Sequence, residues 1–218
     1  MLTRYGTDVM VAVAITVVVL FGIGAWTDDR WIKIICFAVG IFLTAFSLNF
    51  FRDPERTPDT KGKPLESLII SPADGKIVLI KEVIESEYLG GKATMVSIFM
   101  SPLNVHVNRN PVAGIIEHLK YIKGEFRVAS DDEAANVNER QNIGVNSNGR
   151  KLFFSQVTGF VARRIVCELK EGDSVKTGMR FGMIKFGSRV DVYFPPSAKI
   201  LVKEGEIMTA GETVMAEW

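Results

Sequence analysis

The stretch KFGSRVDVYFP, residues 185–195, indicates how the C-terminal part of the chain folds. After its glycine the side chains alternate with a period of two, which is typical of a β-strand. One face of this strand carries Val190, Val192 and Phe194, and the other carries Arg189, Asp191 and Tyr193. Glycine is unfavourable in a strand and usually marks a bulge or a close backbone approach. The sequence therefore predicts a strand that begins at an unusual place, the Gly187–Ser188 bond.

The surrounding region, residues 65–218, has the same character throughout. Short β-branched apolar runs alternate with turn residues, which predicts a mainly β domain of many short strands, sandwich or barrel-like. A weak internal repeat relates KEGDSVKTG (170–178) to KEGEIMTAG (203–211). This repeated turn resembles the paired hairpins of lipoyl/biotinyl barrel-sandwich domains, which are related by a quasi-two-fold axis.

The N-terminal part differs in composition. Two runs without a charged residue, 9–26 and 34–51, each approach the ~20 residues that a helix needs to cross a bilayer. A short polar linker joins them, which predicts a membrane hairpin over residues 1–51, followed by a linker at 52–64 and the β-rich domain at 65–218. Basic residues after the second run place that domain on the cytoplasmic side of the cell membrane. A signal peptide is the alternative for the first run, but a second run follows it and no small-x-small cleavage site ends it.

Composition excludes several classes of function. The net charge of +1 gives no electrostatic case for binding nucleic acid. Cys36 and Cys167 are the only cysteines and Cys36 lies in an apolar run, so a disulfide is not expected. No spacing of His, Cys, Asp and Glu indicates a metal site.

Ser188 is the first candidate for chemistry. No G-x-S-x-G elbow surrounds it, so a hydrolase nucleophile is not indicated. Its hydroxyl can, however, reach the unhindered carbonyl of Gly187 through a five-membered ring. An N-to-O acyl shift would give an ester, and elimination followed by hydrolysis would leave a pyruvoyl group.

Two further stretches carry candidate residues. SPADGKIV (71–78) places Asp74 in a turn before a strand, where an aspartate most often only caps the turn. FMSPLNVHVNRNP (99–111) places His106 in an apolar segment, where a lone histidine is most often structural. NERQN (138–142) taken by itself is expected to be a solvated loop.

Together, these stretches carry a resemblance. FGSRVDVYFP, SPADG, MSPLNVHVNR and VARRIV (161–166) resemble the short form of phosphatidylserine decarboxylase, and NERQN is similar to an Asn-Glu-Arg-Asn element of that family, with Gln141 as a departure. The resemblance runs from about residue 49 to the C-terminus, and the N-terminal hairpin also fits it.

The resemblance implies a zymogen that cleaves itself between Gly187 and Ser188. The products are a β chain, residues 1–187, and an α chain, residues 188–218, which begins with a pyruvoyl group made from Ser188. The family uses an Asp-His-Ser arrangement, and Asp74 and His106 stand at the matching positions. Longer bacterial members carry a second histidine three residues after the first, where this chain has Arg109, so either His106 serves the roles of both histidines or Arg109 takes one of them.

The implied activity is decarboxylation of phosphatidylserine to phosphatidylethanolamine through a Schiff base with the pyruvoyl group, with His106 as the acid that protonates the α-carbon. The partners implied are a phospholipid, the membrane and the two processed chains as a heterodimer. Four arginines are candidates for the substrate phosphate: Arg109, Arg163, Arg164 and Arg189. Arg163 and Arg164 are equally well explained as a solvated or membrane-facing basic pair.

Two alternatives remain open from the sequence. A decarboxylase of another serine phospholipid, such as an ether lipid, would carry the same active-site residues. A membrane-tethered barrel-sandwich adaptor without chemistry would carry the same fold and stay uncleaved.

Overall fold

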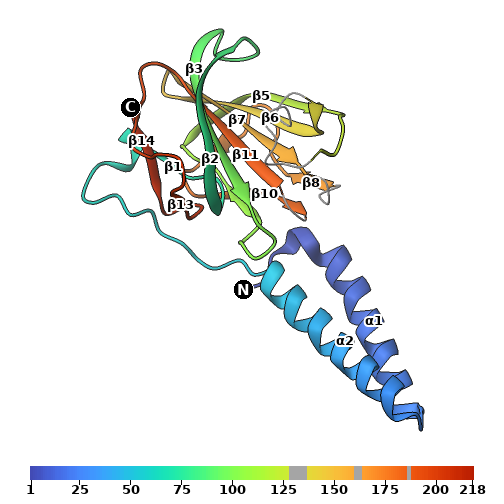
Figure 1. Cartoon of the computed structure of the whole chain (residues 1–218). Coiled ribbons are helices and arrows are strands. Elements are labelled where there is room, and N and C mark those ends of the chain that lie inside the picture. Colours follow the sequence, from blue (N-terminus) through green and yellow to red (C-terminus); the bar gives the residue numbers. More distant parts are fainter. Residues whose placement is uncertain (128–136, 160–163, 186–187) are drawn as a thin grey trace. The chain divides into compact units, whose positions relative to one another are not determined.

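A computed structural model describes residues 1–127, 137–159, 164–185 and 188–218 (Figure 1). The chain divides into two compact units, Met1–Pro54 and Glu55–Trp218. The predicted cleavage residue Gly187 and the predicted phosphate ligand Arg163 lie outside the described residues.

The first unit is a helical hairpin. A 3-10 turn, η1 (Arg4–Gly6), leads into α1 (Thr7–Trp26), and α2 (Arg30–Phe50) follows after a three-residue turn. Asp29 caps α2, because its carboxylate accepts hydrogen bonds from the backbone N–H groups of Trp31 (2.8 Å) and Ile32 (3.0 Å). Gly40 lets the helices approach closely, since a Cβ there would lie 2.3 Å from the Phe21 ring.

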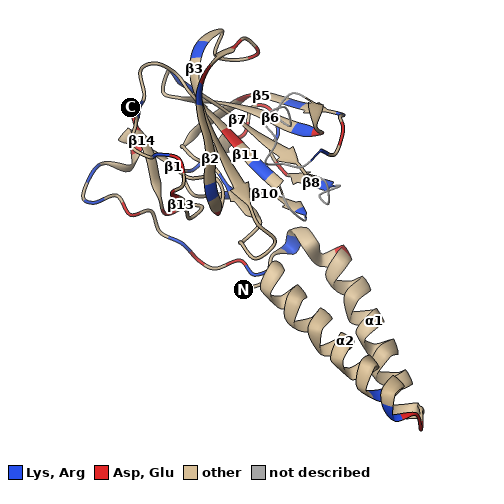
Figure 2. Cartoon of the chain, viewed as in Figure 1, with Lys and Arg blue, Asp and Glu red and all other residues tan. Residues whose placement is uncertain are grey.

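Both helices are long and apolar enough to cross a membrane. Charged residues gather near the two ends of the hairpin and leave its length uncharged (Figure 2). Within this unit the apolar side chains are mostly exposed, which distinguishes the pair from the buried core helices of a water-soluble domain. The hairpin thus favours membrane association.

The second unit confirms the prediction of a mainly β domain. After the short turn η2 (Leu65–Ser67), its strands in chain order are β1 (Leu68–Ile70), β2 (Gly75–Glu85), β3 (Gly91–Met100), β4 (Val107–Arg109), β5 (Gly114–Ile122), β6 (Arg140–Ser147), β7 (Arg150–Thr158), β8 (Arg164–Cys167), β9 (Ser174–Val175), β10 (Arg180–Lys185), β11 (Ser188–Phe194), β12 (Lys199–Ile200), β13 (Ile207–Met208) and β14 (Val214–Glu217). The largest sheet, in the order β13-β2-β3-β11-β7-β6-β5-β9, curls into a half-barrel (Figure 1). Two small sheets, β1-β14-β12 and β4-β10-β8, complete the unit.

The internal repeat corresponds to two equivalent halves of the large sheet. In the KEGEIMTAG copy, Gly205 N–H donates to Ile77 O (2.9 Å), and in the KEGDSVKTG copy Gly172 N–H donates to Ile116 O (2.8 Å). Each copy then adds a two-residue strand to the sheet edge, β13 on β2 and β9 on β5. Counted inward from either edge, the large sheet therefore has equivalent strands at equivalent positions, and β11 and β7 lie at its centre.

The predicted alternation along β11 is confirmed. Val190, Val192 and Phe194 belong to the hydrophobic core and are at most 1% exposed. β11 pairs antiparallel with β3 on one edge and with β7 on the other, so it is held along its whole length. Ser188 opens this central strand on the face that carries the core.

Candidate active site

Ser188 occupies a buried place at the end of three adjacent strands. In register it pairs with Met100, the last residue of β3, and with Thr158, the last residue of β7. The side chain is fully buried, and its hydroxyl donates to the Met100 sulfur at 3.4 Å. A thioether is a weak acceptor, so this contact does not engage the hydroxyl strongly.

Met100 also connects Ser188 with the segment that carries His106. The Asn108 amide in β4 lies 3.8 Å from the Met100 sulfur and donates to Pro72 O at 3.5 Å. His106 stands two residues earlier and is fully buried. Its Nδ1 lies 2.9 Å from Asn104 O, and because a carbonyl oxygen only accepts, Nδ1 carries the proton. In the neutral form of this ring the lone pair then lies on Nε2, as a general base requires.

Asp74 forms a buried ion pair with Arg56. The guanidinium binds both carboxylate oxygens, with Nη1 on Oδ1 and Nη2 on Oδ2, the latter at 2.9 Å. Ala210 joins the pair, because its N–H donates to Asp74 Oδ1 and its carbonyl accepts from Arg56 Nη1, each at 2.8 Å. Asp74 is thus held by the linker and by the segment after β13.

The equivalent half of the sheet tests whether the turn itself needs Asp74. Residues 71–75 and 110–114 make matching turns, in which Gly211 N–H donates to Ser71 O and Gly178 N–H to Asn110 O, both at 2.8 Å. The position of Asp74 is taken by Ala113 in the second half. The turn therefore forms without a carboxylate, which disfavours the reading of Asp74 as a mere turn cap.

Asp74 and Ser188 lie on either side of the end of β3, and β4, which follows His106 in the chain, is bound to the turn that carries Asp74. β2 and β11 pair with opposite edges of β3, with Lys76 opposite Phe99 and Ser188 opposite Met100. Neighbouring strands lie ~4.8 Å apart, so the start of β2 and Ser188 lie about 10 Å apart. The Arg109 N–H donates to Pro72 O at 3.0 Å and fastens β4 to the same turn.

The described arginines occupy different environments. Arg109 is 4% exposed and donates from Nη1 to Gly178 O at 3.1 Å. Arg164 is exposed at the start of β8, opposite Lys185, the last described residue before Ser188. Arg189 is fully buried on the face of β11 opposite to Ser188. The structure thus pairs Arg164 with Lys185, three residues before Ser188 in the sequence, and places Arg189 on the face of β11 opposite to Ser188.

Arg189 and Asp191 form an ion pair on the second face of β11. Arg189 Nε lies 2.8 Å and Nη2 3.1 Å from the Asp191 carboxylate oxygens, and both side chains are fully buried. Next to them, burial raises the pKa of the Tyr193 phenol above its ordinary value, and the Asp191 charge raises it further. On the neighbouring small sheet, burial raises the pKa of the Cys167 thiol to about 11.

Asp191→Ala is expected to lower the free energy of unfolding by about 3–5 kcal/mol, because it leaves the Arg189 charge buried without its carboxylate. Urea unfolding of the detergent-solubilised protein measures this. A double variant, Arg189→Met with Asp191→Leu, is expected to recover most of the loss, since replacing both charges by apolar groups is close to neutral. A loss below about 1 kcal/mol for the single variant contradicts the stabilising role of the pair.

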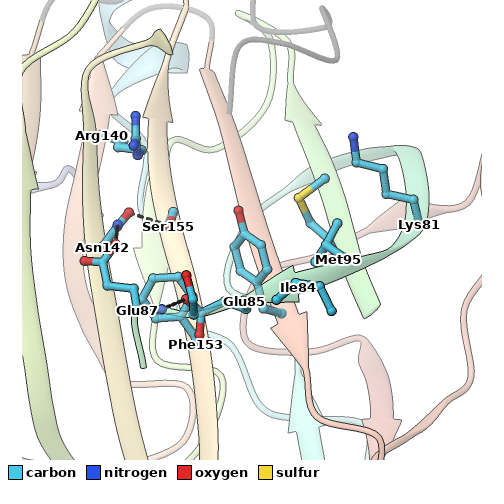
Figure 3. Close-up of a pocket in the computed structure, with 12 residues that line it drawn as sticks. Lys81, Ile84, Glu85, Glu87, Met95, Arg140, Asn142, Phe153 and Ser155 are labelled. Carbon is cyan, nitrogen blue, oxygen red and sulfur yellow. Dashed lines mark hydrogen bonds between the residues drawn. The ribbon is translucent and has the colours of Figure 1, made fainter. Parts of the chain in front are cut away.

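A cavity of about 250 Å³ lies on this second face of the sheet (Figure 3). Asn142 in its wall accepts from the Ser155 hydroxyl (2.7 Å) and donates to Glu87 (2.9 Å). None of the predicted site residues that the structure describes lines it. The expectation that NERQN is a solvated loop is wrong: its last three residues open β6, and Asn138 is fully buried and donates to Thr158 O at 2.8 Å.

Comparison with known proteins identifies the family. A family model described as phosphatidylserine decarboxylase matches residues 43–216. Proteins named phosphatidylserine decarboxylase proenzyme are similar over most or all of the chain. The one from Chlorobium luteolum is 44% identical over 220 residues, which cover 100% of both chains. The one from Chlorobaculum tepidum is 48% identical over 214 residues, 98% of this chain and 96% of the relative. The one from Salinibacter ruber is 48% identical over 196 residues, 88% and 85% of the two chains.

The chain belongs to the phosphatidylserine decarboxylase family. The resemblance drawn from the sequence motifs is thereby confirmed. The word proenzyme in the names of these relatives says that they are made as precursors.

The sequence motifs did not indicate three residues that contact Ser188 or its neighbours in the candidate site. Met100 contacts the Ser188 hydroxyl, Asn108 in β4 contacts the Met100 sulfur, and Arg56 binds Asp74. Met100 and Asn108 lie inside the quoted stretch 99–111, but nothing in their spacing distinguishes them from core residues. Arg56 lies in a stretch whose composition indicates only a linker.

Proposed function

We propose that the protein is a self-processing, pyruvoyl-dependent phosphatidylserine decarboxylase that makes phosphatidylethanolamine at the membrane. The observation that carries this proposal is the position of Ser188. It is a buried serine with a weakly engaged hydroxyl, at the first residue of the central strand, directly after Gly187 in the sequence. Asp74 directly precedes β2, which pairs with the other edge of β3, and His106 directly precedes β4, whose Asn108 amide contacts Met100 at the end of β3.

Self-cleavage would begin when His106 Nε2 takes the Ser188 hydroxyl proton and the oxygen attacks the Gly187 carbonyl carbon. The peptide C–N bond breaks and the nitrogen takes a proton, which leaves an ester. Removal of the Ser188 α-proton then expels the Gly187 carboxylate, and water replaces the nitrogen as ammonia is released. The β chain ends at Gly187, and the α chain begins with a ketone. The negative charge of Asp74 would stabilise the imidazolium that His106 becomes when it takes the proton.

The surroundings of Ser188 suit a pyruvoyl group at the start of the α chain. A cut before Ser188 leaves the new N-terminus as the first residue of β11, held by β3 and β7. The α chain also contributes β13 to β2 and β14 to β1, so it stays bound to the β chain through backbone hydrogen bonds without a covalent link. These pairings favour a stable αβ heterodimer.

In the decarboxylation itself, the pyruvoyl ketone would take up the substrate amine and accept the electron pair that CO₂ leaves behind. His106 would hold the proton that is delivered to the substrate α-carbon. Arg164, exposed opposite Lys185, is the best placed of the described arginines to meet the phosphate. Arg163, beside it in the sequence, is retained as a second phosphate candidate.

The membrane hairpin suits this substrate. Moving a lipid chain into water costs ~0.8 kcal/mol per CH₂, so an enzyme held at the membrane surface needs to take in only the headgroup. Basic residues after α2 favour the cytoplasmic side for the β-rich unit. The equivalent halves of the sheet support a distant relationship to the lipoyl/biotinyl barrel-sandwich domains, which we include in the proposal.

Release of CO₂ from headgroup-labelled lipids in mixed micelles tests the activity. Diacyl phosphatidylserine is expected to be turned over, and glycerophosphoserine at the same bulk concentration far more slowly, because it does not concentrate at the micelle surface. An ether-linked serine phospholipid in the same assay tests the alternative substrate. If fully cleaved protein releases no CO₂ from any serine phospholipid, the proposed activity is wrong.

A further inference from the structure

Arg56 lies outside every motif that pointed to the active site, yet it makes the closest contacts to Asp74. The side chains of Arg56 and Asp74 are only 7% and 11% exposed. Both carboxylate oxygens face the guanidinium, in the bidentate geometry that fixes a carboxylate in position and orientation. Two other ion pairs of the linker are far more open: Lys63–Glu217 is 52% and 24% exposed, and Arg180–Glu55 is 28% and 75% exposed.

The fold does not require this pair. The equivalent turn in the second half of the sheet has Ala113 in place of Asp74 and keeps the same backbone hydrogen bond. Gly211 packs against two arginines, since a Cβ there would lie 2.7 Å from Arg109 Cδ and 3.8 Å from Arg56 Cβ. A Cβ added at its equivalent, Gly178, would meet no described atom within 4 Å beyond its chain neighbours. The arginine environment is thus specific to the half that carries Ser188.

Arg56 also has a distinctive place in the sequence. Five residues, 51–55, separate it from the end of α2. Immediately before it, Glu55 accepts from Arg180 Nη2 at 2.8 Å, and this contact lowers the Glu55 pKa below its usual range. The segment between the membrane hairpin and the β-rich unit is therefore fastened by two neighbouring ion pairs, one of which includes Asp74.

We propose that Arg56 is a positioning residue for self-cleavage, which holds the Asp74 carboxylate in the position and orientation that it needs for its part in the reaction. This inference rests on the proposed self-processing of the chain. It adds that Arg56, a linker residue, belongs to the self-cleavage site. Cleavage then depends on the packing of the linker against the β-rich unit. Ala210 assists from the α-chain side by binding both partners.

The rate of appearance of the residue 188–218 fragment, followed on denaturing gels of the full chain, tests the proposal. Arg56→Gln is expected to slow cleavage on the order of 10²-fold, the usual effect of a misplaced catalytic group. Arg56→Lys, which restores the charge without the bidentate fork, is expected to cleave at an intermediate rate. Lys63→Gln removes another linker cation with a carboxylate partner, and wild-type cleavage is expected for it.

A double-mutant cycle separates positioning from a merely structural role. If Arg56 acts through Asp74, adding Arg56→Gln to Asp74→Asn causes no further slowing beyond Asp74→Asn alone. A further multiplicative loss in the double variant overturns the proposal. So does a wild-type rate for Arg56→Gln, or equal rates for Arg56→Lys and Arg56→Gln. If Arg56→Gln does not fold, the comparison of Arg56→Lys with wild type decides, and a wild-type rate overturns the proposal.

The controls distinguish this proposal from the proposed function. If wild-type protein never cleaves, the proposed self-processing is wrong, whatever the role of Arg56. If wild-type protein cleaves and the Arg56→Gln variant cleaves at the same rate, only the proposed role of Arg56 is wrong.

Discussion

Ser188→Ala is expected to leave the chain whole and without decarboxylase activity. Without the hydroxyl there is no nucleophile for the Gly187 carbonyl, and without cleavage there is no ketone to take up the substrate amine. The expected effect is therefore complete on both readouts, fragment formation and CO₂ release. Replacing a nucleophile that acts in every turnover would abolish CO₂ release alone. Replacing Ser188 is expected to abolish self-cleavage as well, because the serine is itself converted into the pyruvoyl group.

A second buried serine provides the matched control. Ser97 is fully buried in β3, paired in register with Asp191, and it contributes nothing to the proposed chemistry. Ser97→Ala is expected to cleave and turn over as wild type does. Fragment formation by Ser188→Ala at the wild-type rate contradicts the assignment of Ser188.

His106→Ala is expected to slow self-cleavage by about 10²–10⁴-fold, the usual contribution of a positioned general base. The ring is fully buried, and its Nδ1–H donates to Asn104 O, which leaves Nε2 as the basic nitrogen. Any cleaved fraction is expected to release CO₂ slowly too, because in the proposed mechanism the same ring would hold the proton for the substrate carbon. Pulse-labelled protein on a denaturing gel measures the first effect, and CO₂ release measures the second.

His106→Asn distinguishes a base from a structural histidine. Its amide can still donate to Asn104 O, but it has no basic nitrogen. Equal defects in the alanine and asparagine variants support the base, and near-normal cleavage by the asparagine variant contradicts it. His118→Ala is the control for losing a histidine, since His118 is partly exposed and pairs with Glu87 at 2.8 Å.

The regular features of the fold could be predicted because each follows from local periodicity. The alternation from Arg189 to Phe194 reports which side chains face the core, and it holds along β11. The two uncharged runs form the two long helices. The repeated KEG turns bind β5 and β2 in the same way, since each repeat carries the residues that its own turn needs.

Features that depend on contacts between distant residues could not be predicted. Arg56 and Asp74 are close only after the linker meets the SPADG turn, and composition marks the linker only as polar. NERQN has the composition of a solvated loop because its residues are polar, but the Asn138 amide donates to the backbone carbonyls of Arg127 and Thr158. The alternation in β11 already placed Arg189 on the face opposite to Ser188, which disfavours it as a partner of the same substrate.

The intact mass of the chains in purified wild-type protein tests the central claim most directly. Self-processing predicts two chains, residues 1–187 and 188–218, with the smaller chain lighter than a serine-initiated peptide by the mass of one ammonia molecule and resistant to N-terminal sequencing. A single chain of 24.2 kDa, or a fragment that begins with an unmodified serine, contradicts it.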